Sequence, residues 1–112
     1  MFEKDMTVGL LLDFYGEILT EHKRNILDMY YNEDFSLSEI AEQIGISRQG
    51  VRDAIVKASN ELRFYEEKLG LAKRLKQVEK LADTLSALSC EHKLPKDIID
   101  TIELLTQAVR QD

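Results

Sequence analysis

Apolar positions recur at helical spacing through most of the chain, most clearly in its middle. One apolar pattern ends at Ile44, and Gly45 then supplies the backbone freedom for a tight turn. No segment requires a strand, so the pattern predicts an all-α protein. After the turn, apolar residues follow in steps of four, three, four and three, which is the buried stripe of an amphipathic helix: Val51, Ile55, Ala58, Leu62 and Tyr65.

Residues 37–48 have the spacing of a helix-turn-helix motif. Two isoleucines mark one buried face of the first helix, a small residue lies four positions before the turn glycine, and a third isoleucine is expected to fill the turn. Since nothing after the motif indicates a strand, we expect a helix-turn-helix domain without a wing. The residues that carry the spacing are Ile40, Ile44, Ala41, Gly45 and Ile46.

Residues with capping side chains precede the predicted helices. Ser36 and Glu39 have the spacing of a capping box, in which the serine oxygen accepts from a backbone N–H of the first turn and the glutamate accepts from the serine N–H. Ser47 takes the capping position of the next helix. Thr20 takes that of an earlier helix, which ends near Tyr31.

A short first helix is expected over residues 6–18. Thr7 is available as its cap. Apolar residues recur about once per helical turn in this segment, at Met6, Leu10, Leu11, Phe14 and Ile18.

Two long amphipathic helices follow the helix-turn-helix, and Pro95 is suited to the first turn of the second. The preceding helices offer limited surface to cover both apolar stripes. The first stripe therefore either folds back on them or, as we favour, pairs with the same helix of a second subunit to form a homodimer. We expect a helix-turn-helix domain over residues 1–64 and a dimerisation segment over residues 65–112. The predicted dimerisation residues are Leu71, Leu75, Val78, Leu81, Leu85 and Leu88.

The formal net charge of −6 argues against a generic binder of polyanions, because affinity for phosphates comes chiefly from Lys and Arg. Residues 1–35 carry three basic and eight acidic side chains. Residues 36–64 carry four of each, and residues 65–80 carry five basic against three acidic side chains. Any nucleic acid would therefore contact the middle of the chain.

The sequence holds little catalytic chemistry. Cys90 is the only cysteine, so no intrachain disulfide is expected, and we expect its side chain to be buried or half-buried. His92 lies near it but His22 does not, which leaves too few ligands for a structural zinc. No phosphate loop or nucleophile motif occurs, so we expect no enzyme, metal or cofactor. Residues 1–5 resemble neither a signal peptide nor a membrane anchor, so we expect a cytoplasmic protein.

The outward face of the helix after the turn is the candidate nucleic-acid interface. In a major groove, arginine makes paired hydrogen bonds to guanine and glutamine to adenine. A solvated surface helix would explain the same side chains without a ligand, and Asp53 on this face repels phosphates. The candidate contacts are Arg48, Gln49, Arg52 and Lys57.

Gly50 interrupts the first turn of this helix, where it costs about 1 kcal/mol relative to alanine. A close approach of a backbone or phosphate would explain the glycine, and so would crowding against the preceding helix. We include Gly50 among the candidate contacts.

A second basic group follows further along the chain. It could contact a phosphate backbone beside the groove, or an RNA helix, which is recognised mainly by shape and backbone. A solvated helix face is the simpler account, since alternating Lys and Glu are usual on exposed helices. The group consists of Lys68, Lys73, Arg74, Lys76 and Lys80, of which Lys73, Arg74 and Lys80 are the candidates for testing.

These motifs resemble two known families. Residues 19–62 resemble region four of bacterial sigma factors, which reads promoter DNA. Over nearly its whole length the chain resembles the YlxM-like family of small bacterial helix-turn-helix proteins, notably at residues 14–16, 48–54 and 65–69.

The YlxM-like resemblance implies a regulator linked to the signal recognition particle pathway, with the particle's RNA or its protein as partner. Where sigma region four carries a more basic recognition helix, this chain has Gly50 and Asp53, which makes an RNA or protein target more credible. The alternative is a sequence-specific DNA-binding transcription regulator that reads bases through Arg48, Gln49 and Arg52.

Overall fold

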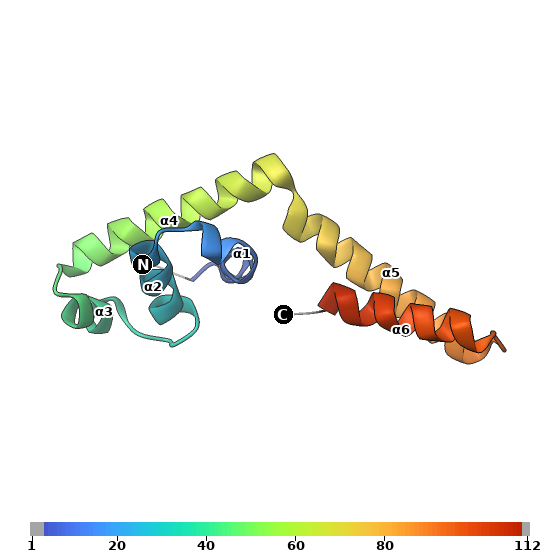
Figure 1. The fold of residues 1–112 in the computed structure, drawn as a ribbon. Coiled ribbons are helices and arrows are strands. Elements are labelled where there is room, and N and C mark those ends of the chain that lie inside the picture. Colours follow the sequence, from blue (N-terminus) through green and yellow to red (C-terminus); the bar gives the residue numbers. More distant parts are fainter. Residues whose placement is uncertain (1–3, 111–112) are drawn as a thin grey trace. The chain divides into compact units, whose positions relative to one another are not determined.

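The computed structural model describes residues 4–110, which form six α-helices and one short 3-10 turn, with no strand among them. The prediction of an all-α protein is therefore confirmed. The helices form two compact units, of which the first ends at Gly70 and the second begins at Leu71. In chain order, the elements (Figure 1) are α1 Met6–Tyr15, η1 Gly16–Ile18, α2 Glu21–Tyr31, α3 Leu37–Ile44, α4 Arg48–Leu69, α5 Leu71–Glu91 and α6 Lys96–Arg110.

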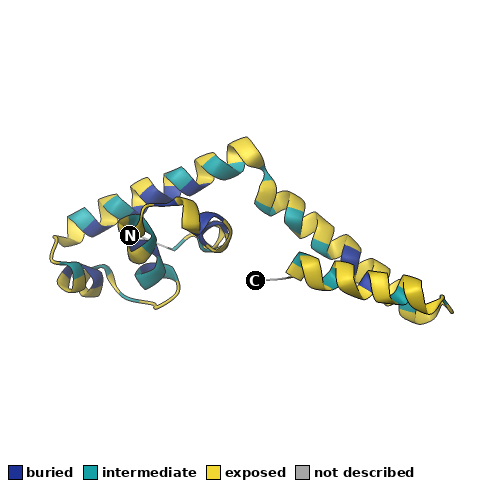
Figure 2. Ribbon diagram, viewed as in Figure 1, coloured by how far each residue is buried: buried dark blue, intermediate teal, exposed yellow. Residues whose placement is uncertain are grey.

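The core of the N-terminal unit is built on α4. Helices α1, α2 and α3 all contact it. Figure 2 shows the buried residues on the side of α4 that faces these helices. The predicted stripe lies there, with Val51, Ala58 and Leu62 fully buried, Ile55 1% exposed and Tyr65 half-buried.

Local hydrogen bonds set the two helices of the helix-turn-helix. Ser36 Oγ accepts from the Glu39 N–H and Glu39 Oε1 accepts from the Ser36 N–H, both at 3.1 Å, which confirms the capping box. Gly45 ends α3 in the left-handed conformation at φ 74°. Ser47 Oγ then accepts from the Gly50 N–H at 2.9 Å and caps α4 as predicted.

The side chain of Ile46 lies against the first turn of α4, near Gly50, and fills the turn only in part. It is 39% exposed. The backbone also closes the turn, because the N–H groups of Gly45 and Ile46 both donate to the carbonyl oxygen of Ala41.

Helix α1 differs from its prediction in its cap and in its buried face. Its cap is Asp5, which accepts from the Thr7 N–H at 2.9 Å, rather than Thr7. Apolar residues occupy both faces of this short helix, so their spacing alone could not decide which face meets α4. The buried residues are Val8, Leu11, Leu12 and Tyr15, and the exposed ones are Met6, Leu10 and Phe14, followed by Ile18 in η1.

The C-terminal unit is a hairpin in which α5 and α6 lie side by side (Figure 1). The predicted domain boundary between residues 64 and 65 lies inside α4, which continues to its left-handed cap at Gly70. Cys90, near the end of α5, is exposed, contrary to expectation. Cys90 lies at the end of a unit of only two helices, so too few helices surround its side chain to bury it.

Polar contacts fasten α2 to α4 at the edge of the core. Lys23 Nζ lies 2.8 Å from Glu61 Oε2, and the Tyr65 hydroxyl donates to Glu61 Oε1, also at 2.8 Å. The hydrogen bond from Lys23, followed by that from Tyr65, holds the pKa of the Glu61 carboxyl below its usual value. The charged form of Glu61 therefore stabilises the fold.

We expect Glu61→Gln to lower the free energy of unfolding by about 0.5–1 kcal/mol at neutral pH, the range for a partly exposed ion pair. Because the folded-state pKa is lowered, this stabilisation is present above the unfolded-state pKa of about 4.3 and is lost as pH falls through the folded-state value. Urea unfolding followed by tyrosine fluorescence measures it, since all four tyrosines lie in the N-terminal unit, at residues 15, 30, 31 and 65.

Glu67→Gln is the control, because Glu67 is an exposed carboxylate on the same helix. It should leave the pH profile unchanged. A Glu61→Gln protein as stable as the wild type at neutral pH would contradict the prediction.

Candidate nucleic-acid interface

The first turns of α4 project the predicted contact residues into solvent. The helix starts directly after the Ser47 cap, and Arg48, Gln49 and Arg52 lie exposed on its first two turns. These are the turns from which a recognition helix contacts base edges. Lys57 is exposed one turn further on. The fold thus places Gln49, Arg52 and Lys57 away from the buried stripe. Arg48, three positions before Val51, lies on the side of the stripe and is exposed because it begins the helix.

Gln49 is engaged within the helix itself. Its Nε2 donates to Asp53 Oδ1 at 2.9 Å. Glutamine and aspartate at positions i and i+4 form such bonds on helix surfaces, so the spacing in the sequence already carried this signal. Reading an adenine with Gln49 would use the oxygen and the second N–H of its amide, and the carboxylate of Asp53 would remain beside the contact.

An open hollow of about 540 Å³ lies beside this face, between the start of α2 and α4. His22 and Lys23 contribute to it from α2, while Asp53, Lys57 and Asn60 contribute from α4. His22 lies 35 positions before Lys57, and only the packing of α2 on α4 brings the two together, so the sequence alone could not place His22 in the site. The hollow adds His22 to the candidate interface.

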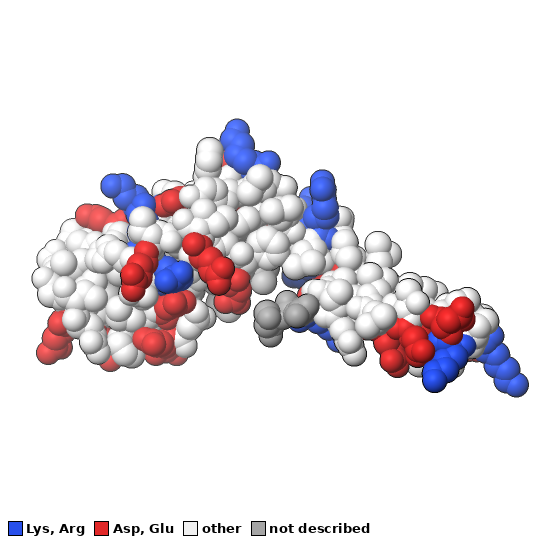
Figure 3. Space-filling view, in the orientation of Figure 1, with Lys and Arg blue, Asp and Glu red and all other residues white. Residues whose placement is uncertain are grey.

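The helix before the turn brings negative charge to the same end of the unit. Glu39 and Glu42 are exposed on α3, the helix that crosses the phosphate backbone in DNA-bound helix-turn-helix proteins. On the face seen in Figure 3, acidic side chains are spread over the N-terminal unit, and the basic side chains stand in separate groups. The electrostatic field here is weaker than that of a basic recognition surface.

The second basic group is divided between the two units. Lys68 lies near the end of α4, where its Nζ is 5.8 Å from the centre of the Phe64 ring. The other four members are exposed on the first three turns of α5: Lys73, Arg74, Lys76 and Lys80.

Other kinds of site find no support in residues 4–110. No cluster of three or more His, Cys, Asp or Glu side chains there could hold a metal ion. His22 and His92 lie in different units. None of the described helices combines the length and the apolar character needed to span a membrane.

The fold and the exposed face of α4 define this chain as a helix-turn-helix protein. It belongs to the family described as "Putative helix-turn-helix protein, YlxM / p13 like", whose model matches residues 2–105. This confirms the family resemblance.

Relatives in this family align along most of the chain. The UPF0122 protein lin1916 of Listeria innocua is 43% identical over 94% of this chain and 96% of its own length. The UPF0122 protein TTE1463 of Caldanaerobacter subterraneus is 51% identical over 68% of each chain. The UPF0122 protein Teth514_1714 of Thermoanaerobacter is 40% identical over 91% of this chain and 90% of its own.

Gly50 is not required by crowding against α3. A Cβ at this position would lie 3.1 Å from Ser47 Oγ and 3.5 Å from Ile46 Cδ1, both in the turn. The equivalent position of α3 is Glu39, whose side chain is accommodated beside the same kind of serine cap. Ser47 is exposed and can shift by the few tenths of an ångström that the contact needs.

We therefore expect Gly50→Ala to stabilise the N-terminal unit by up to about 1 kcal/mol, the difference in helix propensity. Gly45→Ala should instead destabilise it by about 1–2 kcal/mol, since the left-handed conformation is strained for alanine. Urea unfolding followed by tyrosine fluorescence compares the two variants. Destabilisation by Gly50→Ala would show that the turn is more tightly packed than these distances indicate.

Proposed function

We propose that this protein is a non-enzymatic regulator of the signal recognition particle pathway, acting in the cytoplasm and binding the particle's RNA through α4 and the basic residues of α5. Membership of a helix-turn-helix family supports binding to nucleic acid. The exposed Arg48, Arg52 and Lys57 supply the positive charge for it.

The hydrogen bond from Gln49 to Asp53 is the observation that favours RNA over base-specific DNA. It fixes a carboxylate on the recognition face, beside the amide that would read adenine. RNA helices are recognised mainly by shape and by contacts to phosphate and 2′-hydroxyl groups, which do not require a glutamine that reads a base edge. The exposed acids of α3 further disfavour the standard approach to a DNA backbone.

A direct contact with the particle's protein component is the second part of the proposal. The mixed charge of the α3–α4 surface suits a protein partner with basic side chains. The regulator would act as a homodimer, so that each molecule presents two copies of α4.

The alternative is a sequence-specific DNA-binding transcription regulator. The exposed position of Arg48 and Arg52 on the first two turns of α4 is the observation in its favour. Selection of duplexes from a random pool distinguishes the two functions, since a regulator of this kind should enrich a two-fold symmetric site. Failure to enrich any consensus would exclude the alternative.

We expect the wild-type chain to bind the particle's RNA in a filter-binding assay, with affinity that falls steeply as salt rises, because binding releases counterions from phosphates. Arg52→Ala combined with Lys73→Ala should weaken binding at least about tenfold and reduce the salt dependence.

Lys96→Ala is the matched control. It removes one exposed lysine at the start of α6, away from both basic groups in sequence, and should leave the affinity unchanged. Absence of salt-sensitive binding by the wild type, or equal effects of the double variant and the control, would reject the RNA function. A pull-down with the particle's purified protein tests the protein contact separately.

A further inference from the structure

Helix α5 packs on α6 through mostly small side chains rather than through its leucines. Ala82 is buried in the seam between the two helices, and Ser86 and Ser89, one and two turns further on, are half-buried. Facing them on α6, Ile102 is buried, and Ile99 and Val109 on the same side are half-buried. The contact between the two helices thus leaves the leucine-rich side of α5 partly exposed, with Leu85 at its edge toward α6.

The leucine-rich side of α5 has the spacing of a coiled-coil seam. Its apolar residues follow in steps of three, four and three, which are the a and d positions of a heptad repeat. Leu81, the most exposed of them, has 70% of its surface accessible. The seam consists of Val78, Leu81, Leu85 and Leu88, at 39, 70, 41 and 46% exposure.

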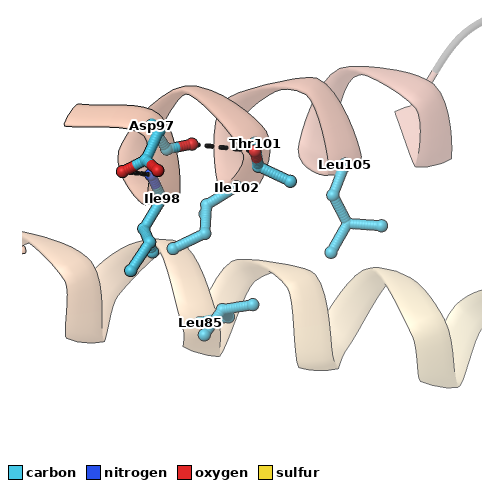
Figure 4. Close-up of a pocket in the computed structure, with 6 residues that line it drawn as sticks. All are labelled: Leu85, Asp97, Ile98, Thr101, Ile102 and Leu105. Atoms are coloured by element: carbon cyan, nitrogen blue, oxygen red, sulfur yellow. Dashed lines mark hydrogen bonds between the residues drawn. The ribbon is translucent and has the colours of Figure 1, made fainter. Parts of the chain in front are cut away.

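Helix α6 presents a hole beside this seam. A hollow of about 300 Å³ lies between the helices, and Figure 4 shows Leu85 directed toward it from α5. The residues that line it on α6 include a set at positions i, i+3, i+4 and i+7, which is the four-residue hole that receives one side chain of a facing helix in knobs-into-holes packing: Ile98, Thr101, Ile102 and Leu105.

Two polar side chains line the hollow, Thr101 and Asp97, and both make hydrogen bonds within α6. Asp97 Oδ1 accepts from the Ile98 N–H at 3.0 Å. Thr101 Oγ1 donates to the carbonyl oxygen of Asp97 at 2.8 Å (Figure 4). An apolar side chain can therefore enter without leaving the hydroxyl unpaired, which would be costly.

The properties of the seam favour a second copy of this chain as its occupant. The positions that flank it on the side away from α6 are uncharged over the central turns, with Gln77 and Thr84 there, so two copies of the seam can meet without like-charge repulsion. Two helices alone are too small to enclose a core. Among the described apolar residues of this unit, Ala82 and Ile102 alone are buried.

We propose that the exposed leucine seam of α5 and the hole on α6 join the same surfaces of a second copy, so that two hairpins form a four-helix bundle. This deepens the homodimer of the proposed function and changes its predicted contacts. Leu75 is half-buried, whereas Ile98 and Leu105 of α6, both exposed, join the interface. Leucine knobs from one hairpin fill the hole of the other, as in other four-helix bundles.

The test is the mass of the full chain in solution by analytical ultracentrifugation over the micromolar range. The wild type should sediment as a dimer. Leu81→Glu, which changes the most exposed residue of the seam, should raise the dimer dissociation constant at least about a hundredfold, because a carboxylate would be buried without a partner. Ala87→Glu adds the same charge to an exposed position of α5 outside the seam and should leave the dimer intact.

A wild-type monomer at these concentrations would overturn the bundle, because the seam would then not bind a second copy of the chain. A dimer resistant to Leu81→Glu would also overturn it. If Leu81→Glu unfolds the hairpin, the wild type still gives a test, because the thermal midpoint of a dimer rises with protein concentration and that of a monomer does not.

RNA binding is judged separately from assembly. A monomeric wild type that binds the particle's RNA rejects the bundle and the homodimer, and leaves the RNA binding of the proposed function. A dimer that binds no RNA supports the bundle and rejects the RNA binding of the proposed function.

Discussion

The buried stripe of α4 is the constraint on which the N-terminal unit depends. Val51, Ile55 and Leu62 are almost completely buried, and α1, α2 and α3 all pack on the side of the helix that carries them. Burial of each such side chain contributes about 1.5–3 kcal/mol. The stripe also fixes the orientation of the helix, so the side opposite the core must face solvent. The exposed position of Gln49 and Lys57 is therefore a consequence of the core. Arg48, on the side of the stripe, is exposed because it begins the helix.

Features set by local chemistry could be predicted from the sequence, and features set by tertiary contacts could not. The capping box of Ser36 and the left-handed turn at Gly45 depend on neighbouring residues alone, and both are present. Helix α1 has apolar residues on both faces, so its buried face was decided only by the packing of α1 on α4. The exposure of Ile46 and Cys90 likewise depends on how many elements surround them.

The candidate interface shows the same division. The exposed side of α4 follows from helical periodicity, and the bond between Gln49 and Asp53 follows from their i, i+4 spacing. His22 belongs to the site through the fold, because the packing of α2 on α4 places it with Lys57 around one hollow. In the hairpin, periodicity predicted that a leucine stripe needs a partner. Only the structure shows that small residues of α5 pack on α6 and leave much of this stripe exposed.

A nearly neutral recognition face and an uncovered hairpin have a common consequence. Nucleic-acid affinity grows with the number of phosphates that are neutralised. The exposed face of α4 offers few basic residues for this purpose, and the acidic Asp53 lies between them. One copy of the face would bind weakly. Two copies joined by a helical bundle bind as a single molecule, and the second contact then forms at a high effective concentration, which multiplies the affinity without adding any contact. In the proposed dimer, the leucine seam therefore supplies the avidity that the charge of α4 does not.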